Sequence, residues 1–214
     1  EDDLIERIRA GGIKAACAAH KPAVQRYGIS ADEAHRFGLP CGGTMELVLE
    51  PVSEHSRLEE LLAACEQRRS VERTLELTTG QVRLADGRRD GVPTLDAQRL
   101  TTWFGPRFRI IVIGAGDLSR FLCEIALGLG FELIVCDPRI ERQAAWSLPG
   151  VEISREMPDD LILRVKPDAR TAVVALTHDP KLDDMALLEA LKSPAFYVGA
   201  LGSRRNDAAR RARL

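Results

Sequence analysis

The stretch that decides the fold of the second half of the chain is Phe108 to Pro138, FRIIVIGAGDLSRFLCEIALGLGFELIVCDP. Apart from Arg109, residues 108–113 form an apolar run of the kind that a strand buried on both faces requires. Residues 118–129 have the apolar spacing of a helix, and residues 133–136 form a second buried run. The stretch therefore predicts a strand, a tight turn, a helix and a second strand.

The same alternation continues to the end of the chain. Three further strands are predicted at residues 151–154, 171–177 and 196–201, with helices at 159–165, 182–191 and 204–213. Alternating strands and helices predict a doubly wound parallel sheet, which binds its ligands outside the carboxyl ends of the strands. The fold class is therefore α/β, with a Rossmann-like domain at residues 106–214 after a smaller α/β (α+β) domain at residues 1–105.

The first domain mixes predicted helices, turns and strands, and this pattern gives way to the regular alternation of strands and helices around residues 101–107. Its predicted elements are a helix stopped by Gly11-Gly12, a capped helix over 30–37, a strand over 44–52, a helix over 58–69, a hairpin over 71–84 that turns near Thr79-Gly80, and a polar loop over 86–98.

Composition excludes several classes of protein. The chain has 214 residues, of which 45% are hydrophobic and 29% charged, as in ordinary folded proteins. Lys and Arg total 30 against 32 Asp and Glu, a net charge of −2, so we expect neither a nucleic acid nor an anionic membrane as partner. The most apolar stretch, residues 125–136, contains Glu132 and falls short of the roughly 20 residues that span a bilayer.

The start of the chain and its cysteines bear on the compartment. Glu1-Asp2-Asp3 lacks the features of a secretion signal, and the missing methionine suggests that residues are absent upstream. The 5 cysteines are scattered, odd in number and without a CxxC pair, so no disulfide framework is expected. A reducing cytoplasm is the predicted location.

Gly114-Ala115-Gly116 lies between the first strand and its helix, where a dinucleotide fingerprint belongs. Gly114 allows the tight turn, and Gly116 lets a pyrophosphate approach the backbone at the amino end of the helix. The third position is Ser119, so the match is partial. Asp137 ends the second strand, where an acid commonly binds ribose, while Arg139 leaves a phosphorylated ribose open. The alternative is that these glycines serve packing only.

Two later loops reach the same edge of the sheet. His178 follows the fourth strand and could act as an acid, a base or a hydrogen-bond donor. Gly202-Ser203 opens the last helix beside Arg204, an arrangement that suits a phosphate. The alternatives are a locally bonded turn residue for His178 and a solvated basic face for the arginines.

Cys41-Gly42-Gly43 places a thiol in a glycine-rich loop, where backbone amides could lower its pKa or hold an anion. The other cysteines lie on apolar faces of predicted elements and are expected to be buried and inert. Cys17 and His20 have helical spacing, but with no second pair nearby no zinc site is expected.

Taken in order, five motifs resemble the XdhC/CoxI family of xanthine dehydrogenase accessory proteins. They are FGLPCGGT at residues 37–44, GAG at 114–116, CDPR at 136–139, THDPKLD at 177–183 and YVGALGSRR at 197–205. The resemblance implies an α/β domain followed by a Rossmann domain, in a homodimeric protein that binds molybdenum cofactor during its sulfuration. It also implies delivery to a molybdenum hydroxylase such as xanthine dehydrogenase, with a cysteine desulfurase as second partner.

The resemblance also assigns expected roles and reveals departures. It makes Cys41 a contact for the cofactor or its sulfur ligands, and makes the Gly114 loop and Gly202-Ser203 contacts for its phosphate or nucleotide part. An S-G-G-C segment expected just upstream of Glu1 is absent, and so are a strand and a helix expected after the last helix.

Three functions follow as hypotheses. The leading one is a chaperone that binds molybdenum cofactor without turnover, for which a soft thiolate at Cys41 suits molybdenum or transferred sulfur. The second is an oxidoreductase using NAD(P) or FAD, bound by Gly114, Gly116 and Asp137, with His178 as proton donor. The third is an interaction module without a ligand.

Overall fold

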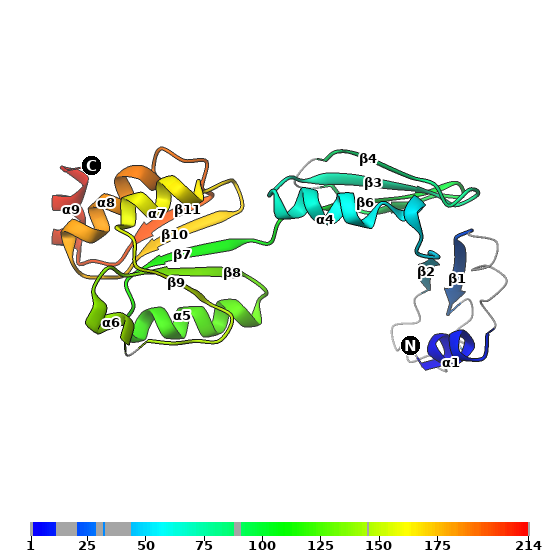
Figure 1. Ribbon diagram of the computed structural model, residues 1–214, viewed down its shortest axis with the longest axis horizontal. Helices are drawn as coiled ribbons and strands as arrows, with labels where there is room; N and C mark the ends of the chain where they lie inside the picture. Colours follow the sequence, from blue (N-terminus) through cyan, green and yellow to red (C-terminus); the bar gives the residue numbers. More distant parts are fainter. Residues whose placement is uncertain are drawn as a thin grey trace. The chain divides into compact units, whose positions relative to one another are not determined.

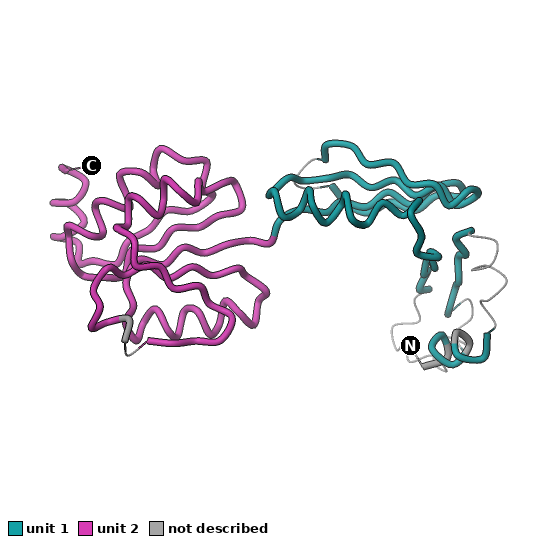
Figure 2. Tube along the Cα trace, in the orientation of Figure 1, with its two compact units in different colours: residues 1–106 teal, residues 107–214 magenta. Residues whose placement is uncertain are grey.

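The computed structural model describes residues 2–11, 21–28, 32, 44–87, 91–144 and 146–213. The chain divides into two compact units, Glu1–Pro106 and Arg107–Leu214 (Figure 2). The predicted site residues Cys41, Gly42 and Gly43 lie outside the described residues, as does the helix expected over 30–37 apart from Asp32.

The second unit is built on a five-stranded parallel sheet, which confirms the predicted Rossmann-like class (Figure 1). Its strand order is β9-β8-β7-β10-β11, so the chain leaves β7 in one direction and later returns to its other side. The order therefore reverses between β7 and β10, which is the point where doubly wound sheets bind ligands. The strands are β7 (Arg109–Ile113), β8 (Glu132–Cys136), β9 (Glu152–Ser154), β10 (Thr171–Ala175) and β11 (Tyr197–Ala200).

Helices cover both faces of this sheet. The helices are α5 (Asp117–Gly128), α6 (Ile140–Ala144), α7 (Pro158–Val165), α8 (Pro180–Ala190) and α9 (Arg204–Arg211). The ribbon shows α7 and α8 on one side of the sheet and α5 on the other (Figure 1). Side chains alternate along β7: Ile111 and Ile113 join the core under α7 and α8, whereas Ile110 and Val112 join the core under α5. Burial on both faces explains the continuous apolar run in the sequence. Each fully buried Ile contributes about 1.5–3 kcal/mol of transfer free energy.

The first unit contains two antiparallel sheets. One pairs β1 with β2, and the other has the order β4-β3-β6-β5. Helix α4 packs on the second sheet through Leu61 and Ala64, which contact Val71 and Leu84. The elements are α1 (Asp2–Arg9), β1 (Ala23–Tyr27), β2 (Met45–Leu49), η1 (Glu54–Ser56), α4 (Leu58–Glu66), β3 (Val71–Glu76), β4 (Val82–Asp86), β5 (Thr94–Leu95) and β6 (Arg99–Phe104).

Three strands of this unit depart from the sequence predictions. β1 was not predicted, and the loop expected over 86–98 contains the short strand β5. Most of β6 falls in the stretch expected to separate the domains, yet it pairs with β3 along its whole length. The physical reason is that strand formation depends on the neighbouring strand more than on local propensity. No described helix combines the length and the apolar character needed to cross a bilayer.

Candidate functional site

The loop after β7 depends on two glycines with different surroundings. Gly114 has a φ of +110°, and a Cβ there would lie 3.1 Å from the backbone of Thr177. Its N–H donates to the carbonyl of Cys136 at 2.7 Å, which fixes the loop to the end of β8. Gly116 is the N-cap of α5, and a Cβ there would meet no atom within 4 Å. Gly114 is therefore required by the fold, whereas the space above Gly116 is open to a ligand.

Asp137, the predicted ribose-binding acid, is completely buried at the end of β8. Its Oδ2 accepts from the N–H of Ala115 at 2.8 Å and from Arg139 Nη2 at 2.7 Å. Its Oδ1 accepts from Arg139 Nε at 2.8 Å and from the Arg139 N–H at 3.1 Å. Burial alone would raise the pKa of Asp137, but these hydrogen bonds outweigh it and hold the pKa below its ordinary value. Both carboxylate oxygens are thus already occupied within the protein.

Trp146 supports the same loop and was missed by the sequence analysis. Its indole N–H donates to the carbonyl of Gly116 at 3.1 Å, and its ring is buried in the α5 side of the core. The guanidinium of Arg120 lies 5.6 Å from the centre of that ring. The available sequence signal was a large aromatic residue in the connection between β8 and β9. Trp146 is therefore a natural reporter of the Gly114–Gly116 loop.

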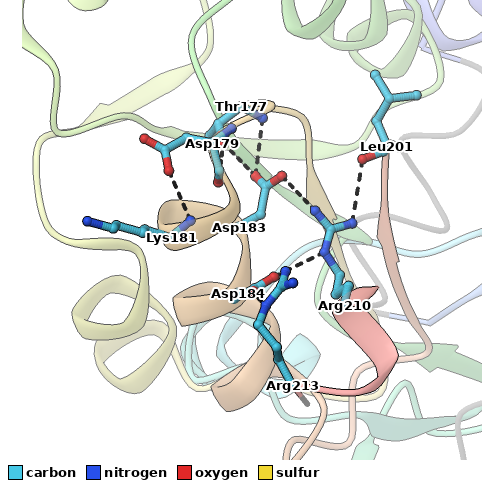
Figure 3. Close-up of polar contacts among 8 residues, drawn as sticks. All are labelled: Thr177, Asp179, Lys181, Asp183, Asp184, Leu201, Arg210 and Arg213. Carbon is cyan, nitrogen blue, oxygen red and sulfur yellow. Dashed lines mark hydrogen bonds and ion pairs between the residues drawn. The ribbon is translucent and has the colours of Figure 1, made fainter. Parts of the chain in front are cut away.

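The turn after β10 holds His178 in a left-handed conformation, with a φ of +61°. The residues on both sides of it are hydrogen-bonded: the N–H of Asp179 donates to Thr177 Oγ1 at 2.8 Å, and Asp179 caps α8 by accepting from the Lys181 N–H at 2.9 Å (Figure 3). The imidazole itself is exposed. Non-glycine residues in this conformation are uncommon and cluster at functional sites.

Two cavities lie at the carboxyl edge of the sheet, and His178 lines both of them. The smaller cavity, of about 180 Å³, also has the Gly114–Gly116 loop, Thr177, Arg139 and Arg142 in its wall. The larger cavity, of about 420 Å³, is lined by His178, Pro180, Leu201, Gly202, Ser203, Asn206, Ala209, Arg210 and Arg213. The structure thus brings together Gly114, Gly116, His178, Gly202 and Ser203.

Arg204 is exposed and, within the described part of the chain, lines neither of these cavities. Arg210 on the same helix and Arg213 just after its end lie in the wall of the larger one instead. The alternative interpretation, a solvated basic face, does not hold for Arg210, which is only 8% exposed and forms ion pairs with Asp183 and Asp184. The reason is helical periodicity, since residues 203, 206, 210 and 213 share one face of α9. That spacing was the available signal.

The described cysteines do not provide a reactive thiol in this crevice. Burial raises the pKa of Cys123 to about 11. Burial, reinforced by the charges of Asp137 and Glu156, raises the pKa of Cys136 to about 12. Because the thiolate is the nucleophile, both are inert near neutral pH. Among the residues that the structure describes, no three or more His, Cys, Asp or Glu side chains gather as a metal site would need.

Comparisons with known proteins agree with the fold. The chain is 25% identical over 222 residues to the molybdenum cofactor insertion chaperone PaoD of Escherichia coli (strain K12), a match that covers 96% of this chain and 60% of PaoD. It therefore spans about three fifths of the length of that relative. A crystal structure of a xanthine dehydrogenase from Bacillus halodurans matches with a TM-score of 0.71 at 22% identity, covering 97% of this chain and 68% of that one. At this identity the likeness shows the fold alone.

The family comparison identifies the second unit. The family model for the XdhC Rossmann domain matches residues 110–214. This range covers the parallel sheet from the second residue of β7 onward and all residues that line the two cavities. The chain thus carries an XdhC Rossmann domain, in agreement with the resemblance to the XdhC/CoxI family that its sequence motifs predicted.

Proposed function

We propose that this chain is an accessory protein that binds molybdenum cofactor as cargo and delivers it to a molybdenum hydroxylase such as xanthine dehydrogenase. The observation that carries the proposal is the meeting of three separate loops around His178 at the carboxyl edge of the sheet. The similarity to PaoD, whose name describes a molybdenum cofactor insertion chaperone, supports the same role.

The phosphate of the cargo belongs, in this proposal, in the smaller cavity. The amino end of α5 directs its free N–H groups there, and the open space above Gly116 lets a phosphate oxygen reach them. Arg142 contributes positive charge to the same wall, whereas the charge of Arg139 is balanced by its ion pair with Asp137. Asp117 also lines this cavity, and its carboxylate would repel a phosphate placed next to it. Gly202 and Ser203 offer a second set of N–H groups at the start of α9.

The sulfur chemistry is assigned to Cys41, with Gly42 and Gly43 as its backbone surroundings. A soft thiolate suits molybdenum or a transferred sulfur. We propose that the chain supports sulfuration of the bound cofactor, with a cysteine desulfurase as donor, and that it acts as a homodimer. A reducing cytoplasm, in which thiols stay reduced, is the location that this proposal expects.

The alternative is an oxidoreductase with NAD(P) or FAD in the crevice. The geometry at Asp137 argues against it, because a carboxylate that already accepts hydrogen bonds from Ala115 and Arg139 has little capacity left for ribose hydroxyls. Micromolar binding of one of these dinucleotides, abolished by Asp137→Ala, would favour this alternative. If neither the wild type nor Asp137→Ala binds any of these dinucleotides, the oxidoreductase alternative is excluded.

The experiment that tests the proposal uses the whole protein and freshly released molybdenum cofactor. After incubation and gel filtration, the protein peak is assayed for molybdenum and pterin, with and without excess NAD(P) or FAD. Stoichiometric molybdenum and pterin are expected for the wild type. A protein peak empty of both would refute the proposal.

Two variants locate the binding site, and a third serves as control. We expect Gly116→Ala to lose cofactor because its methyl group fills the space above the amino end of α5. Cys41→Ala is expected to lose binding or sulfuration with the fold intact. Gly128→Ala is the matched control, since a Cβ at this position near the end of the same helix also meets no atom within 4 Å and lies outside both cavities. If Gly116→Ala and Gly128→Ala bind cofactor equally well, the amino end of α5 is excluded as the binding site.

A further inference from the structure

Asp183 is a completely buried carboxylate on α8, behind the turn that carries His178. Its Oδ1 accepts from the hydroxyl of Thr177 at 2.6 Å and from the Thr177 N–H at 3.2 Å. Thr177 Oγ1 in turn accepts from the N–H of Asp179. The carboxylate therefore fixes, directly or through one hydroxyl, the residue on either side of His178.

The second oxygen of the same carboxylate faces α9. Asp183 Oδ2 accepts from Arg210 Nη2 at 3.1 Å, and Arg210 also donates to the carbonyl of Leu201 at 3.5 Å (Figure 3). Leu201 leads into Gly202 and Ser203, and all three residues line the larger cavity with His178. The ion pair of two side chains, Asp183 and Arg210, thus connects the loop after β10 with the loop after β11.

Stability alone does not explain this arrangement. Burying a carboxylate and a guanidinium costs desolvation energy that their attraction only roughly offsets, so well-packed apolar side chains would hold α8 and α9 together as firmly. What the ion pair adds is direction, because charged hydrogen bonds fix both partners in one geometry. Here the geometry that is fixed is a strained one, His178 at a φ of +61°.

We propose that Asp183 is a positioning residue that holds His178 between the two cavities and couples their walls through Arg210. Loss of Asp183 releases both loops together, so the imidazole and the Gly202–Ser203 backbone leave their ligand-binding positions. This inference rests on the proposed function, because that proposal assigns the two cavities to the cargo. The positions of the two loops can nevertheless be tested on the protein without cargo.

The test compares Asp183→Ala with Asp184→Ala in the full chain by NMR. Asp184 is the matched control, because it also accepts from Arg210, at 3.1 Å, and from Arg213, at 2.7 Å, but its carboxylate is not hydrogen-bonded to the turn at residues 177–179. The imidazole signals of His178 are assigned by their loss in His178→Asn. In Asp183→Ala we expect the His178 ring signals and the Thr177 and Gly202 amide signals to shift together. In Asp184→Ala the His178 and Thr177 signals are expected to stay in place.

A second variant keeps the test decisive if Asp183→Ala does not fold. Thr177→Val removes the 2.6 Å hydroxyl contact but leaves the pair between Asp183 and Arg210, so it should shift the His178 signals and leave Gly202 unchanged. His178 signals that are unchanged in either Asp183→Ala or Thr177→Val, or that move equally in Asp184→Ala, would overturn the proposal.

Binding of cargo supplies a separate readout. With released molybdenum cofactor as probe, we expect Asp183→Ala to bind about tenfold more weakly or worse than wild type, the effect of losing one charged hydrogen-bond partner. Asp184→Ala should retain more of the affinity. If the wild type binds no cofactor, the proposed function fails while the NMR result still decides the role of Asp183.

Discussion

The carboxylate of Asp137 and the backbone N–H of Ala115 form a 2.8 Å hydrogen bond that ties the end of β8 to the loop after β7. A second bond, from the Gly114 N–H to the Cys136 carbonyl at 2.7 Å, runs beside it. The floor of the crevice is therefore formed before any ligand arrives. Asp137 serves as a structural anchor of the loop that was expected to bind phosphate.

Asp137→Asn is expected to lower the free energy of unfolding of the second unit by about 2 kcal/mol, since the amide cannot accept the full set of bonds from Ala115 and Arg139. Denaturation followed by Trp146 fluorescence in a Trp103→Phe background would measure this. Asp160→Asn, at an exposed position on α7, is the control and should have little effect. Equal stabilities of the two variants would contradict the anchoring role.

Acid sensitivity follows from the same carboxylate and from Asp184. Burial alone would raise the pKa of Asp184, but hydrogen bonds from Arg213 and Arg210 hold it below its ordinary value, as the bonds to Asp137 do for that residue. A lowered folded-state pKa gives stability that is present above the unfolded value of about 4 and lost as pH falls through the folded value. Denaturation midpoints at a series of pH values should therefore decline steeply below about 4. The decline should be shallower in Asp137→Asn.

Gly114→Ala tests the turn itself. The new Cβ would lie 3.1 Å from the Thr177 backbone, at a φ of +110° that L residues rarely adopt. We expect a loss of about 1–3 kcal/mol in stability, the usual cost of such strain. The comparison with Gly116→Ala is informative, because the φ there is −117° and the space is open. Thermal unfolding should separate the two variants, and equal melting temperatures would show that the loop can move aside.

Thiol reactivity tests whether Cys41 has the lowered pKa that its glycine-rich loop predicts. With a pKa of about 12, Cys136 has only about one thiolate in 10,000 at pH 8, and Cys123 is similarly protected. Mild alkylation of the native protein, mapped by mass spectrometry, should modify Cys41 and spare Cys123 and Cys136. In urea all 5 cysteines should react. Native labelling of Cys136 would mean that the end of β8 opens readily.

The sequence predicted the parts of the fold whose signal is local. The run Ile110 to Ile113 has to be buried on both faces, and Gly114 ends it where a turn is needed, so β7, its loop and α5 follow from a single stretch. The loops carrying His178 and Gly202 were placed at the same edge because parallel strands end together.

What could not be predicted depends on partners far along the chain. Whether Asp137 is free for ribose depends on how the Arg139 side chain folds back, and the fingerprint does not encode that orientation. Trp146 reaches Gly116 across 30 residues, and Arg210 reaches Asp183 across 27. Helical spacing gives the face of α9 on which Arg210 lies, but not the carboxylate that it meets.

His178→Gly tests whether His178 binds the ligand or is only a locally bonded turn residue. Glycine adopts a φ of +61° without strain, and this gain roughly offsets the extra entropy that glycine loses on folding, so stability should stay within about 1 kcal/mol of wild type. Binding of molybdenum cofactor should nevertheless fall, because the imidazole is removed from the wall shared by both cavities. Thermal unfolding and the gel-filtration assay measure the two effects on one preparation.

Lys166→Gly supplies the control for that experiment. Lys166 is also left-handed, with a φ of +49°, but it ends α7 and is exposed outside both cavities. It should therefore match His178→Gly in stability while binding cofactor like the wild type. If His178→Gly also binds normally, His178 is a turn residue and the cargo is held by the surrounding loops. If it unfolds the second unit, the side chain is needed by the fold, and a ligand-binding role for its strained position is refuted.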